Sequence, residues 1–600
     1  QINRDVTTEG FEVANKDLTI EGTSTEQKPK LTFTKNGIYI RNSNLLLKNL
    51  DINMSGVISA PVTDRPNWMA ICLTEDSSLT LDNTSMVLDA TSVKNNQSTA
   101  PHGIYFAGNG DNTLNVQDGS SLTINGYYNA VAWDGVASHP NSQYHLNVTG
   151  GSTFIADHNE GGLIGRECLD VRVENSTIKV TNCTQRDGSE GRSATNGANV
   201  TLINSTADFS GNTDGNGLHA NNLYVKDSIL TANNNGYAGI RITGKGQFIN
   251  SNITVTGTLG KGHSAIEVDG IRKADNTAEM NNGSLEITDG TVLNVSGNQT
   301  TGIALRDLPI KLSTGTQKAT PSLTIDDSSF VTIRNNKASS SDWNHSRPDL
   351  AGGLLICNGA SAKLGANTII NNNHADNAGD DIIVEPGASL TFSVHNGTGS
   401  GDLLDDCADG IDGWYLDGSG QRWDFHGDQE FVQDLLESDT LLVDNGDGTY
   451  TLIVAADAPG SLALKAAHAE APDPVPDPVD PKPVTPDEPA VPDEPTTPDD
   501  SSNTPETPET PILPEDPELP PVQDARPDAD APILPEDPEL PPVQDARADV
   551  ETPVLPAVQD AHTLPQTGMN LFAALAMALS GAALMAAGAF ASLIGRNARH

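Results

Sequence analysis

Three short apolar runs in this chain each carry one polar side chain of a type that takes part in acid–base or ionic chemistry. The runs read GLHA, GIRI and AIEV, and their polar residues are His219, Arg241 and Glu267. Asp214 and Asp269 lie close to them in the sequence. An imidazole, a guanidinium and carboxylates that meet in space could transfer protons or pair with charged groups of a carbohydrate. These five residues are therefore the candidate catalytic residues of the sequence.

The three polar residues meet only if their runs occupy successive turns of a repeating structure. Side chains alternate between the two faces of a strand, so each polar residue points away from its aliphatic neighbours. Similar runs recur along the chain and predict one outward column, which consists of Tyr39, Tyr105, Ala132, Ile164, His219, Arg241, Glu267 and Ala304. The alternative interpretation is that the charged members form a solvated polar patch without chemistry.

The strands that would position this column are short and regularly punctuated. Runs such as Leu79-Thr80-Leu81 and Leu146-Asn147-Val148 alternate apolar and polar residues, which is typical of strands with one buried face. A second run follows a tight turn, as in VENSTIKV from Val173 to Val180, and a third run opens with Gly or Ala. Three strands thus form a unit, and the units recur at irregular intervals of roughly 23 to 38 residues.

Stacked units of this kind predict a parallel solenoid. Each strand would pair with its counterpart in the next coil and enclose a narrow aliphatic column, for which a hydrophobic content of 36% and an aromatic content of 4% suffice. Asparagine tolerates left-handed backbone geometry, so the runs 233–235 and 371–373 fit turns and could also stack as ladders. A sandwich of antiparallel hairpins is the rival fold, but it does not require the recurring three-strand order.

The pattern of residues 1–400 resembles the right-handed parallel β-helix proteins of the pectate-lyase-like superfamily. The stretch from Thr368 to Phe392 is also similar to NNxAxxxGG-type coils of β-helical bacterial adhesins, although Asp380 and Asp381 replace the usual small residues. The resemblance implies an all-β fold, a right-handed parallel β-helix solenoid. Residues 401–470 are expected to form a small β-rich cap over the last open coil.

Enzymes of this superfamily cleave acidic polysaccharides, and their motifs match this chain only in fragments. Asn212 to Gly215 reads NTDG, as in polygalacturonases, but the paired aspartates that should follow are missing and Asp227 stands alone. A pectate lyase needs clustered carboxylates for calcium, and no such cluster falls at one coil position. We therefore expect no metal and no cofactor. A polysaccharide lyase or glycoside hydrolase that uses the five candidate residues remains the alternative.

The overall charge limits the partners of the chain. A net charge of −46 disfavours nucleic acid and anionic membranes, because both would be repelled by most of the surface. Five widely spaced cysteines match no metal-ligand pattern, and their odd number leaves at least one outside any intrachain disulfide. Neither an initiator methionine nor an apolar leader precedes Gln1, so the sequence is expected to be a processed or trimmed product of a chain with an export signal.

Residues 471–563 form an acidic, proline-rich segment that is predicted to be disordered. The sequence PILPEDPELPPVQDAR occurs at Pro511 and again at Pro532, which is a 21-residue repeat. The segment has no aromatic residues, so it cannot bury enough apolar surface to offset the entropy of ordering. An extended stalk is expected.

Residues 564–600 close the chain with a motif, an apolar run and a basic tail. The motif is Leu564, Pro565, Gln566, Thr567 and Gly568; the apolar run extends from Leu571 to Gly595, long enough for one transmembrane helix. Terminal arginines resist translocation and would halt export. This arrangement resembles the LPXTG substrates of sortases in Gram-positive bacteria. The resemblance implies transient membrane insertion, cleavage after Thr567 by a sortase, and a covalent link from Thr567 to peptidoglycan.

Together these features predict a secreted protein that is anchored to the cell wall on its extracellular face. A solenoid held away from the cell by a stalk presents a long lateral surface. We expect this surface to act as an adhesin or display module that binds glycans or surface proteins of hosts or microbes. Catalysis on the same lateral face is the alternative.

Overall fold

The computed structural model describes most of the chain as far as residue 464. The described residues are 1–61, 68–93, 101–133, 142–165, 168–184, 193–273, 278–339, 351–376, 379–393, 411–416, 421–423, 440–458 and 460–464. They form β-strands and no α-helix. The chain divides into a compact unit of residues 1–484 and a second unit of residues 485–600, and every described residue belongs to the first.

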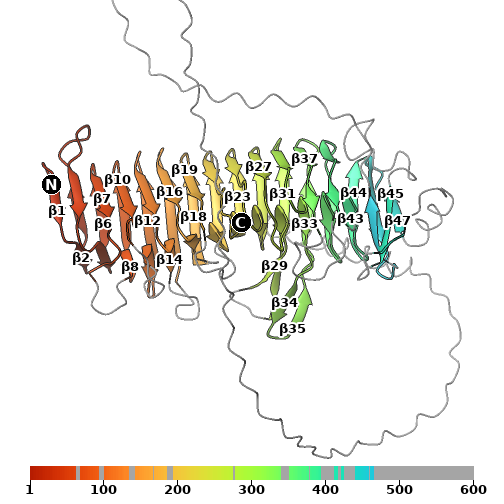
Figure 1. Ribbon diagram of the computed structural model, residues 1–600, viewed down its shortest axis with the longest axis horizontal. Helices are drawn as coiled ribbons and strands as arrows, with labels where there is room; N and C mark the ends of the chain where they lie inside the picture. The colour runs from red at the N-terminus through yellow and green to blue at the C-terminus, as the bar shows by residue number, and fades with distance from the viewer. Residues whose placement is uncertain are drawn as a thin grey trace, which may run out of the picture. The chain divides into compact units, whose positions relative to one another are not determined.

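Three strands make one coil, as the sequence pattern predicts. In an early coil, β4 (Lys30–Phe33), β5 (Ile38–Arg41) and β6 (Asn44–Lys48) follow one another, and β7 (Asp51–Ser55) then pairs in parallel with β4. Repetition of this step builds a β-helix-like solenoid with three long parallel faces, called sheets 1, 2 and 3 below (Figure 1). The antiparallel sandwich is therefore excluded for these coils.

Sheet 1 contains the strand that follows the tight turn of each coil. Its thirteen strands, in hydrogen-bonded order, are β1 (Val6–Thr8), β4, β7, β10 (Ser85–Asp89), β13 (Ser121–Asn125), β16 (Thr153–Asp157), β19 (Thr177–Thr181), β22 (Thr206–Asp208), β24 (Ile229–Thr231), β27 (Asn252–Thr256), β32 (Val292–Ser296), β37 (Phe330–Arg334) and β41 (Thr368–Asn371). The interval between paired residues ranges from 21 (Leu31 with Ile52) to 40 (Ile253 with Leu293), slightly wider than the sequence suggested.

Sheet 2 carries the outward column that contains the candidate residues. It begins with β2 (Phe11–Ala14), β5, β8 (Met69–Thr74), β11 (His102–Ala107), β14 (Asn129–Trp133), β17 (Gly161–Ile164) and β20 (Thr195–Asn196). The first half of the long strand β23 (Leu218–Lys226) continues this face by pairing with β25 (Ile240–Ile242). The face then runs through β28 (Ile266–Val268), β33 (Ile303–Leu305), β39 (Leu354–Ile356) and β43 (Ile382–Val384).

Sheet 3 closes each coil. Its strands are β3 (Leu18–Glu21), β6, β9 (Ser78–Asp82), β12 (Asn112–Gln117), β15 (Tyr144–Thr149), β18 (Leu169–Glu174), β21 (Ala198–Ile203), the second half of β23, β26 (Lys245–Ile249), β31 (Ser284–Thr288), β36 (Ser322–Ile325), β40 (Ser361–Lys363) and β44 (Ser389–Ser393). Because β23 belongs to two faces, sheets 2 and 3 are continuous at that coil.

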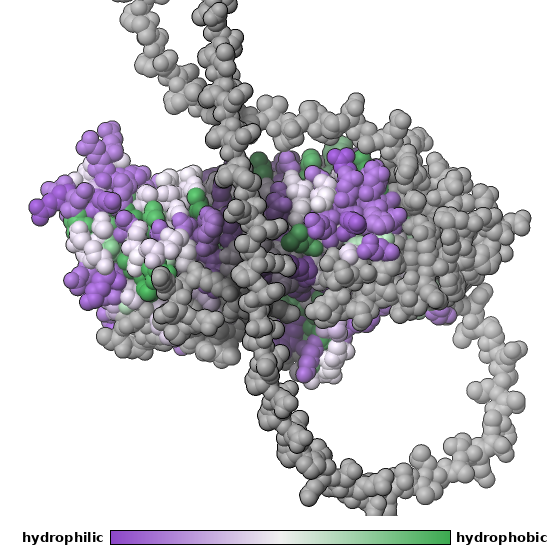
Figure 2. All heavy atoms as spheres, viewed as in Figure 1, coloured by the Kyte–Doolittle hydropathy of each residue, from purple (hydrophilic) through white to green (hydrophobic). Residues whose placement is uncertain are grey.

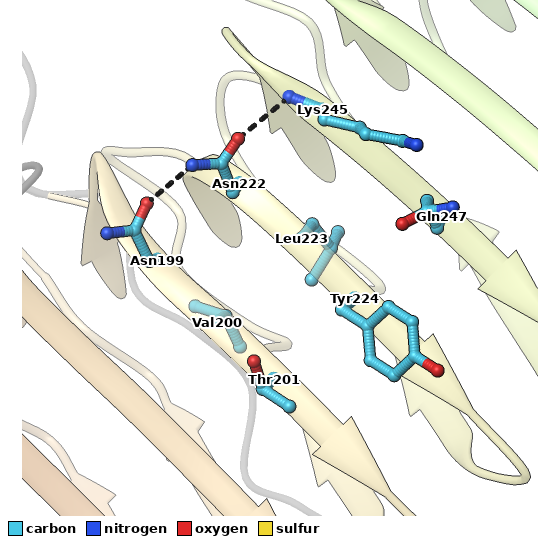
Figure 3. Close-up of a pocket in the computed structure, with 8 residues that line it drawn as sticks. All are labelled: Asn199, Val200, Thr201, Asn222, Leu223, Tyr224, Lys245 and Gln247. Atoms are coloured by element: carbon cyan, nitrogen blue, oxygen red, sulfur yellow. Dashed lines mark hydrogen bonds between the residues drawn. The ribbon is translucent and has the colours of Figure 1, made fainter. Parts of the chain in front are cut away.

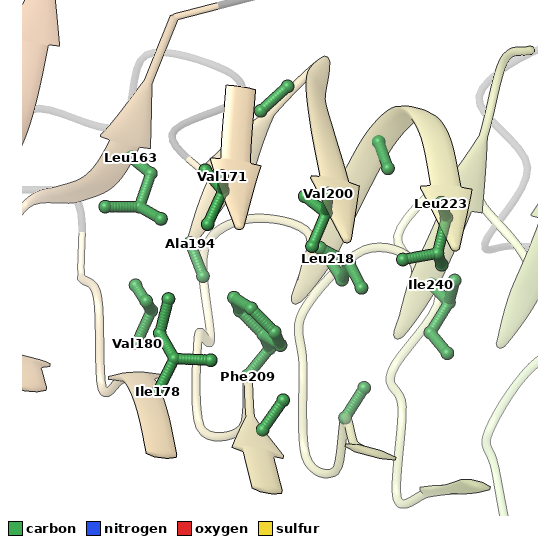
Figure 4. Close-up of a cluster of buried hydrophobic side chains, with 14 of the residues drawn as sticks. Leu163, Val171, Ile178, Val180, Ala194, Val200, Phe209, Leu218, Leu223 and Ile240 are labelled. Atoms are coloured by element: carbon green, nitrogen blue, oxygen red, sulfur yellow. The ribbon is translucent and has the colours of Figure 1, made fainter. Parts of the chain in front are cut away.

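The core is a column of aliphatic side chains between the three sheets. Inward residues of neighbouring coils lie on top of one another, as Leu114, Leu146 and Val171 do on sheet 3, and each is at most 1% exposed. Val180, Phe209 and Leu218 reach the same interior from the other faces (Figure 4). Burial of apolar surface is the main favourable term in folding, and the narrow column obtains it with few residues.

The tight turns between sheets 3 and 1 depend on asparagine and aspartate. Asn175, Asn204, Asp227 and Asn250 all have φ between 45° and 51°, a region that short polar side chains tolerate better than most others. A serine or threonine follows each such turn. Its backbone N–H donates to the hydroxyl oxygen of its counterpart one coil later, in the unbroken series Thr84, Ser120, Ser152, Ser176, Ser205, Ser228, Ser251 and Thr291.

Two antiparallel hairpins extend from the loops that follow sheet 2. The first consists of β29 (Gly270–Arg272) and β30 (Met280–Asn282), and the second of β34 (Pro309–Leu312) and β35 (Gly315–Lys318). They emerge on the same side of the solenoid, and β29 contacts β34 (Figure 1). A short parallel pair, β38 (Lys337–Ala338) with β42 (His374–Ala375), lies between two further coils.

Antiparallel strands follow the last described coil. They are β45 (Ile411–Leu416), β46 (Gln421–Trp423), β47 (Thr440–Asp444), β48 (Thr449–Val454) and β49 (Ser461–Leu464). The strand β48 pairs with β44 and β49 pairs with β43, so these strands occupy edges that would otherwise remain open to other chains.

The predicted stalk and sorting signal lie outside the described residues, as does the apolar run from Leu571 to Gly595. Within the described part of the chain, no helix has the length and apolar character needed to cross a membrane.

Candidate functional site

The register of sheet 2 places the three predicted polar residues side by side. His219 on β23 pairs with Arg241 on β25, and Arg241 pairs with Glu267 on β28. Ala304 on β33 follows in the same column, while Tyr105 and Ala132 are neighbours nearer the N-terminus. The alternation of apolar and polar residues thus located the column. Cys72, which lies between Tyr39 and Tyr105, is a member that the sequence pattern did not supply.

Glu267 is the centre of a buried ionic cluster. One carboxylate oxygen, Oε2, lies 2.8 Å from Nη1 of Arg306 and 3.0 Å from Nδ1 of His263, and Oε1 lies 3.3 Å from Nε of Arg241. Burial alone raises the pKa of this carboxyl, but Arg306, His263 and Arg241 outweigh that effect and hold the pKa well below its usual range. Glu267 is therefore an anion that three basic groups surround.

Asp269 belongs to the same cluster but behaves differently. Its Oδ2 accepts hydrogen bonds from Nη2 and Nε of Arg241 at 2.6 and 3.1 Å, whereas its buried Oδ1 has no hydrogen-bond partner. Burial raises the pKa of Asp269 to about 6; Arg241 opposes the rise and the nearby charge of Glu267 adds to it. Two carboxyl groups on one strand face thus have pKa values that are shifted in opposite directions.

Solvent reaches two basic members of the cluster, whereas Arg306 and the carboxylates are buried. The side chains of Arg241 and His263 are 21% and 20% exposed, while those of Glu267 and Asp269 are fully buried. A polysaccharide chain in contact with this face would therefore meet the guanidinium and the imidazole first. The solvated patch is wrong as a description of the two carboxylates, because both side chains are fully buried.

His219 and Asp214 make other contacts than the ion pairs of the buried cluster. Asp214 is exposed and forms an ion pair with Lys261, in which the carboxylate and ammonium atoms are 3.7 Å apart. His219 lies beside Arg241 in the register, and its backbone oxygen accepts hydrogen bonds from Thr195 and Gly197. Of the five candidate residues, the structure therefore brings Arg241, Glu267 and Asp269 into direct contact.

Two members of the cluster were not among the candidates. Arg306 follows Ala304 by two residues, as Asp269 follows Glu267, and its backbone N–H donates to Val268 on the preceding coil. Arg306 therefore occupies in its coil the position that Asp269 occupies in the preceding coil, and this correspondence could have been found in the sequence. His263 lies in a loop before β28 and packs edge-on against Tyr237, with 5.5 Å between the ring centroids. No local sequence pattern indicates this contact.

The charged residues also connect the solenoid to the second hairpin. Asp307 is fully buried, and its Oδ2 lies 2.6 Å from Nζ of Lys318 at the end of β35. Among the described residues, Asp307, Cys357 and Glu385 form a buried group whose possible ligand atoms all lie within 4.8 Å of one another. Lys318 and the N–H of Asn358, which donates to Glu385, already contact this group, so a cation would compete with them.

Comparisons with known proteins identify no relative: no family model, no curated protein and no solved structure matches the chain. The function therefore has to be argued from the residues and the geometry.

A second feature lies on the outer face of sheet 3. Ten residues of consecutive coils form one column by register, called here the sheet-3 column, and nearly all of them are polar. None is buried, and they are Thr80, Asn115, Asn147, Arg172, Thr201, Tyr224, Gln247, Glu286, Thr324 and Lys363. The amide of Asn147 donates to Asn115 at 2.9 Å, and that of Gln247 donates to Glu286 at 2.8 Å. Hydrogen bonds between coils thus fix the orientation of these side chains.

The sorting motif, Leu564, Pro565, Gln566, Thr567 and Gly568, lies outside the described residues.

Proposed function

We propose that this chain is a sortase-anchored surface protein of a Gram-positive bacterium, and that its right-handed β-helix is an adhesin or display module. It binds glycans or surface proteins of hosts or other microbes. It is linked to peptidoglycan through Thr567, and the acidic proline-rich stalk separates the solenoid from the wall. The LPQTG motif, the apolar run and the basic tail at the end of the sequence support the anchoring.

The observation that carries the binding function is the sheet-3 column. It offers amide, hydroxyl and charged groups at a regular spacing of about 4.8 Å, the distance between neighbouring strands, over ten coils. Hydrogen bonds between the coils fix several of these groups before any ligand arrives, which lowers the entropic cost of binding. A long, polar and rigid surface of this kind suits an extended ligand better than a small substrate.

The hydropathy of the described surface agrees with a display module. On the face drawn in Figure 2, hydrophilic residues dominate the described surface, and the hydrophobic residues are scattered in small patches. Large apolar patches mark membrane or obligate protein interfaces. The net charge of −46 adds repulsion toward nucleic acid, so the proposed partners do not include it.

The purified full chain tests this proposal on a glycan array and in a polysaccharide-degradation screen run in parallel. We expect it to retain particular glycans or immobilised surface proteins and to release them with unchanged mass. Binding to neither class of ligand would contradict the adhesin.

One observation favours the enzyme as a second candidate, namely the opposite pKa shifts of Glu267 and Asp269. Such a pair can provide a base and an acid at the same pH. Complete burial of both carboxylates counts against it, since neither can touch a sugar in this conformation. New reducing ends or unsaturated products in the screen, lost in Glu267→Gln, would establish the enzyme instead.

A further inference from the structure

Sheet 3 is hollowed where three of its coils meet. A groove of about 180 Å³ crosses β21, β23 and β26, and eight residues line it: Asn199, Val200, Thr201, Asn222, Leu223, Tyr224, Lys245 and Gln247 (Figure 3). Val200 and Leu223 are buried and form its floor, and the other six are at least partly accessible. The groove lies on a different face from the charged cluster of sheet 2.

Tyr224 is the aromatic member of the sheet-3 column. By register it stands between Thr201 on the preceding coil and Gln247 on the next, and Figure 3 shows its ring between these two side chains. A tyrosine ring offers an apolar face and a polar edge. A pyranose has the complementary character, because the C–H groups of one ring face are apolar while its hydroxyls point outward.

Amide side chains form one wall of the groove. Nδ2 of Asn222 donates to Oδ1 of Asn199 at 3.0 Å, and the backbone N–H of Lys245 donates to Oδ1 of Asn222 at 3.0 Å. Asn199 in turn donates to Asp170 on the coil before, at 2.9 Å. These bonds hold the amides in a row, so hydrogen-bonding groups are already arranged along the direction in which the coils stack.

The charges around the groove select against an anionic ligand. Among the described residues that line the groove, Lys245 is the only basic one. Its ammonium lies 3.3 Å from the carboxylate of Glu286, which also accepts a hydrogen bond from Gln247. Asp170 adds a negative charge at the other end. With a net charge of −46 on the whole chain, no uncompensated positive charge remains here to attract a polyanion.

We propose that this groove binds a neutral glycan, with one pyranose ring against Tyr224 and its hydroxyls hydrogen-bonded to Gln247, Thr201 and the amide row. The glycan chain runs along the solenoid axis, because the spacing of coils, about 4.8 Å, is close to the length of one sugar residue. This inference rests on the proposed function and names its site and its ligand class.

Calorimetry with the full chain tests the site. The probes are three neutral oligosaccharides (cellohexaose, mannohexaose and chitohexaose) and one polyanion, polygalacturonate. We expect a neutral probe to bind, Tyr224→Ala to weaken binding by about tenfold or more through loss of stacking, and Tyr224→Phe to retain most of it. Thr206→Ala is the matched control, because Thr206 is an exposed residue of β22 on sheet 1 and lies outside the sheet-3 column.

Hydrogen exchange gives a second measurement that does not depend on a variant. The bound glycan should slow amide exchange in 199–201, 222–224 and 245–247 and leave 206–208, the strand β22 on sheet 1, unchanged. Equal affinity of the wild type and Tyr224→Ala would overturn the groove while leaving glycan binding elsewhere intact. Salt-sensitive binding of polygalacturonate, without binding of any neutral probe, would overturn the proposal that the ligand is a neutral glycan. If no glycan binds in this experiment or on the array, both the groove and the glycan part of the proposed function are overturned.

Discussion

Asp269 and Glu267 are two residues apart on one strand face, and their environments separate them chemically. Glu267 contacts Arg306, His263 and Arg241, so its charge is compensated several times over. Among the described residues, Asp269 has Arg241 alone as a close basic partner. Each of the two carboxylates has one buried oxygen without a hydrogen bond. Removal of a buried partner is costly because it leaves the remaining charge uncompensated. The cluster therefore stabilises the fold only as a complete set.

The raised pKa of Asp269 predicts a pH dependence of stability. An unfolded aspartate has a pKa of 3.8, and folding raises that of Asp269 to about 6. Between these values the folded chain holds a proton that the unfolded chain has lost. The contribution of Asp269 to the free energy of unfolding is therefore fully present below about pH 4 and is lost as the pH rises through about 6. The free energy of unfolding of the wild type, relative to Asp269→Asn, should therefore fall between about pH 4 and 6 in urea titrations.

Asp157 provides a control of opposite sign. Burial raises its pKa, but hydrogen bonds from Thr181 and Asn182 and the contact with His158 outweigh burial and lower it. Its contribution is present above an unfolded pKa of 3.8 and is lost as the pH falls through the lower folded value. Asp157→Asn should thus change the pH profile only at the acid end. A wild-type profile parallel to that of Asp269→Asn from pH 4 to 7 would contradict the assignment for Asp269.

At the scale of elements, a buried asparagine ladder follows the corner after sheet 1. Each amide donates to a backbone oxygen of the coil before and to the next side chain. The side-chain bonds run from Asn298 to Asn336 at 2.8 Å, from Asn336 to Asn373 at 3.0 Å and from Asn373 to Asp381 at 2.9 Å. The ladder satisfies backbone groups that the turn leaves without strand partners.

Asn336→Ala should destabilise this part of the solenoid. The substitution removes the amide oxygen that accepts hydrogen bonds from the backbone and side-chain N–H groups of Asn298. It also removes the amide N–H groups that donate to the backbone oxygen of Val295 and to Oδ1 of Asn373. All four hydrogen bonds are buried. Unsatisfied buried groups cost about 1–3 kcal/mol each, so a loss of about 2–4 kcal/mol is expected after partial relaxation. Hydrogen exchange of β32, β37 and β41 measures the local effect.

Asn147→Ala is the matched control for the ladder. Asn147 also donates to an asparagine of the neighbouring coil, but it lies on the outer face, where water can replace the lost bond. Its cost should stay within about 0.5 kcal/mol. Equal destabilisation by the two variants would show that burial of the ladder has no special energetic role.

At the scale of the whole molecule, the proposed role depends on the terminal motif as much as on the solenoid. Thr567→Ala should prevent transfer to peptidoglycan, because the proposed sortase reaction joins the chain to the wall through that residue, and should move the chain from the wall to the membrane or the medium. Muramidase release followed by immunoblotting of cell fractions measures the shift. Thr563→Ala, just outside the motif, should leave the chain in the wall; wall-bound Thr567→Ala protein would contradict the anchor.

The asparagine runs illustrate how far the sequence specified the solenoid. Its composition predicted that asparagines at 233–235 and 371–373 would serve turns and ladders. The structure assigns separate tasks to identical neighbours: Asn234 has a φ of 55°, whereas Asn235 is buried and accepts from Asn212. The sequence could not make this distinction, because it depends on which neighbouring coil each amide faces.

The sequence by itself determined the recurring runs that form strands, their three-part order and the alternation of inward and outward side chains within those runs. These follow from alternation and turn chemistry, which act over a few residues. Only the tertiary structure decided that β23 joins two faces, that Arg306 and His263 complete the cluster, and that Glu267 and Asp269 are buried. Those outcomes depend on loops of unequal length and on contacts between coils, which local sequence patterns do not encode.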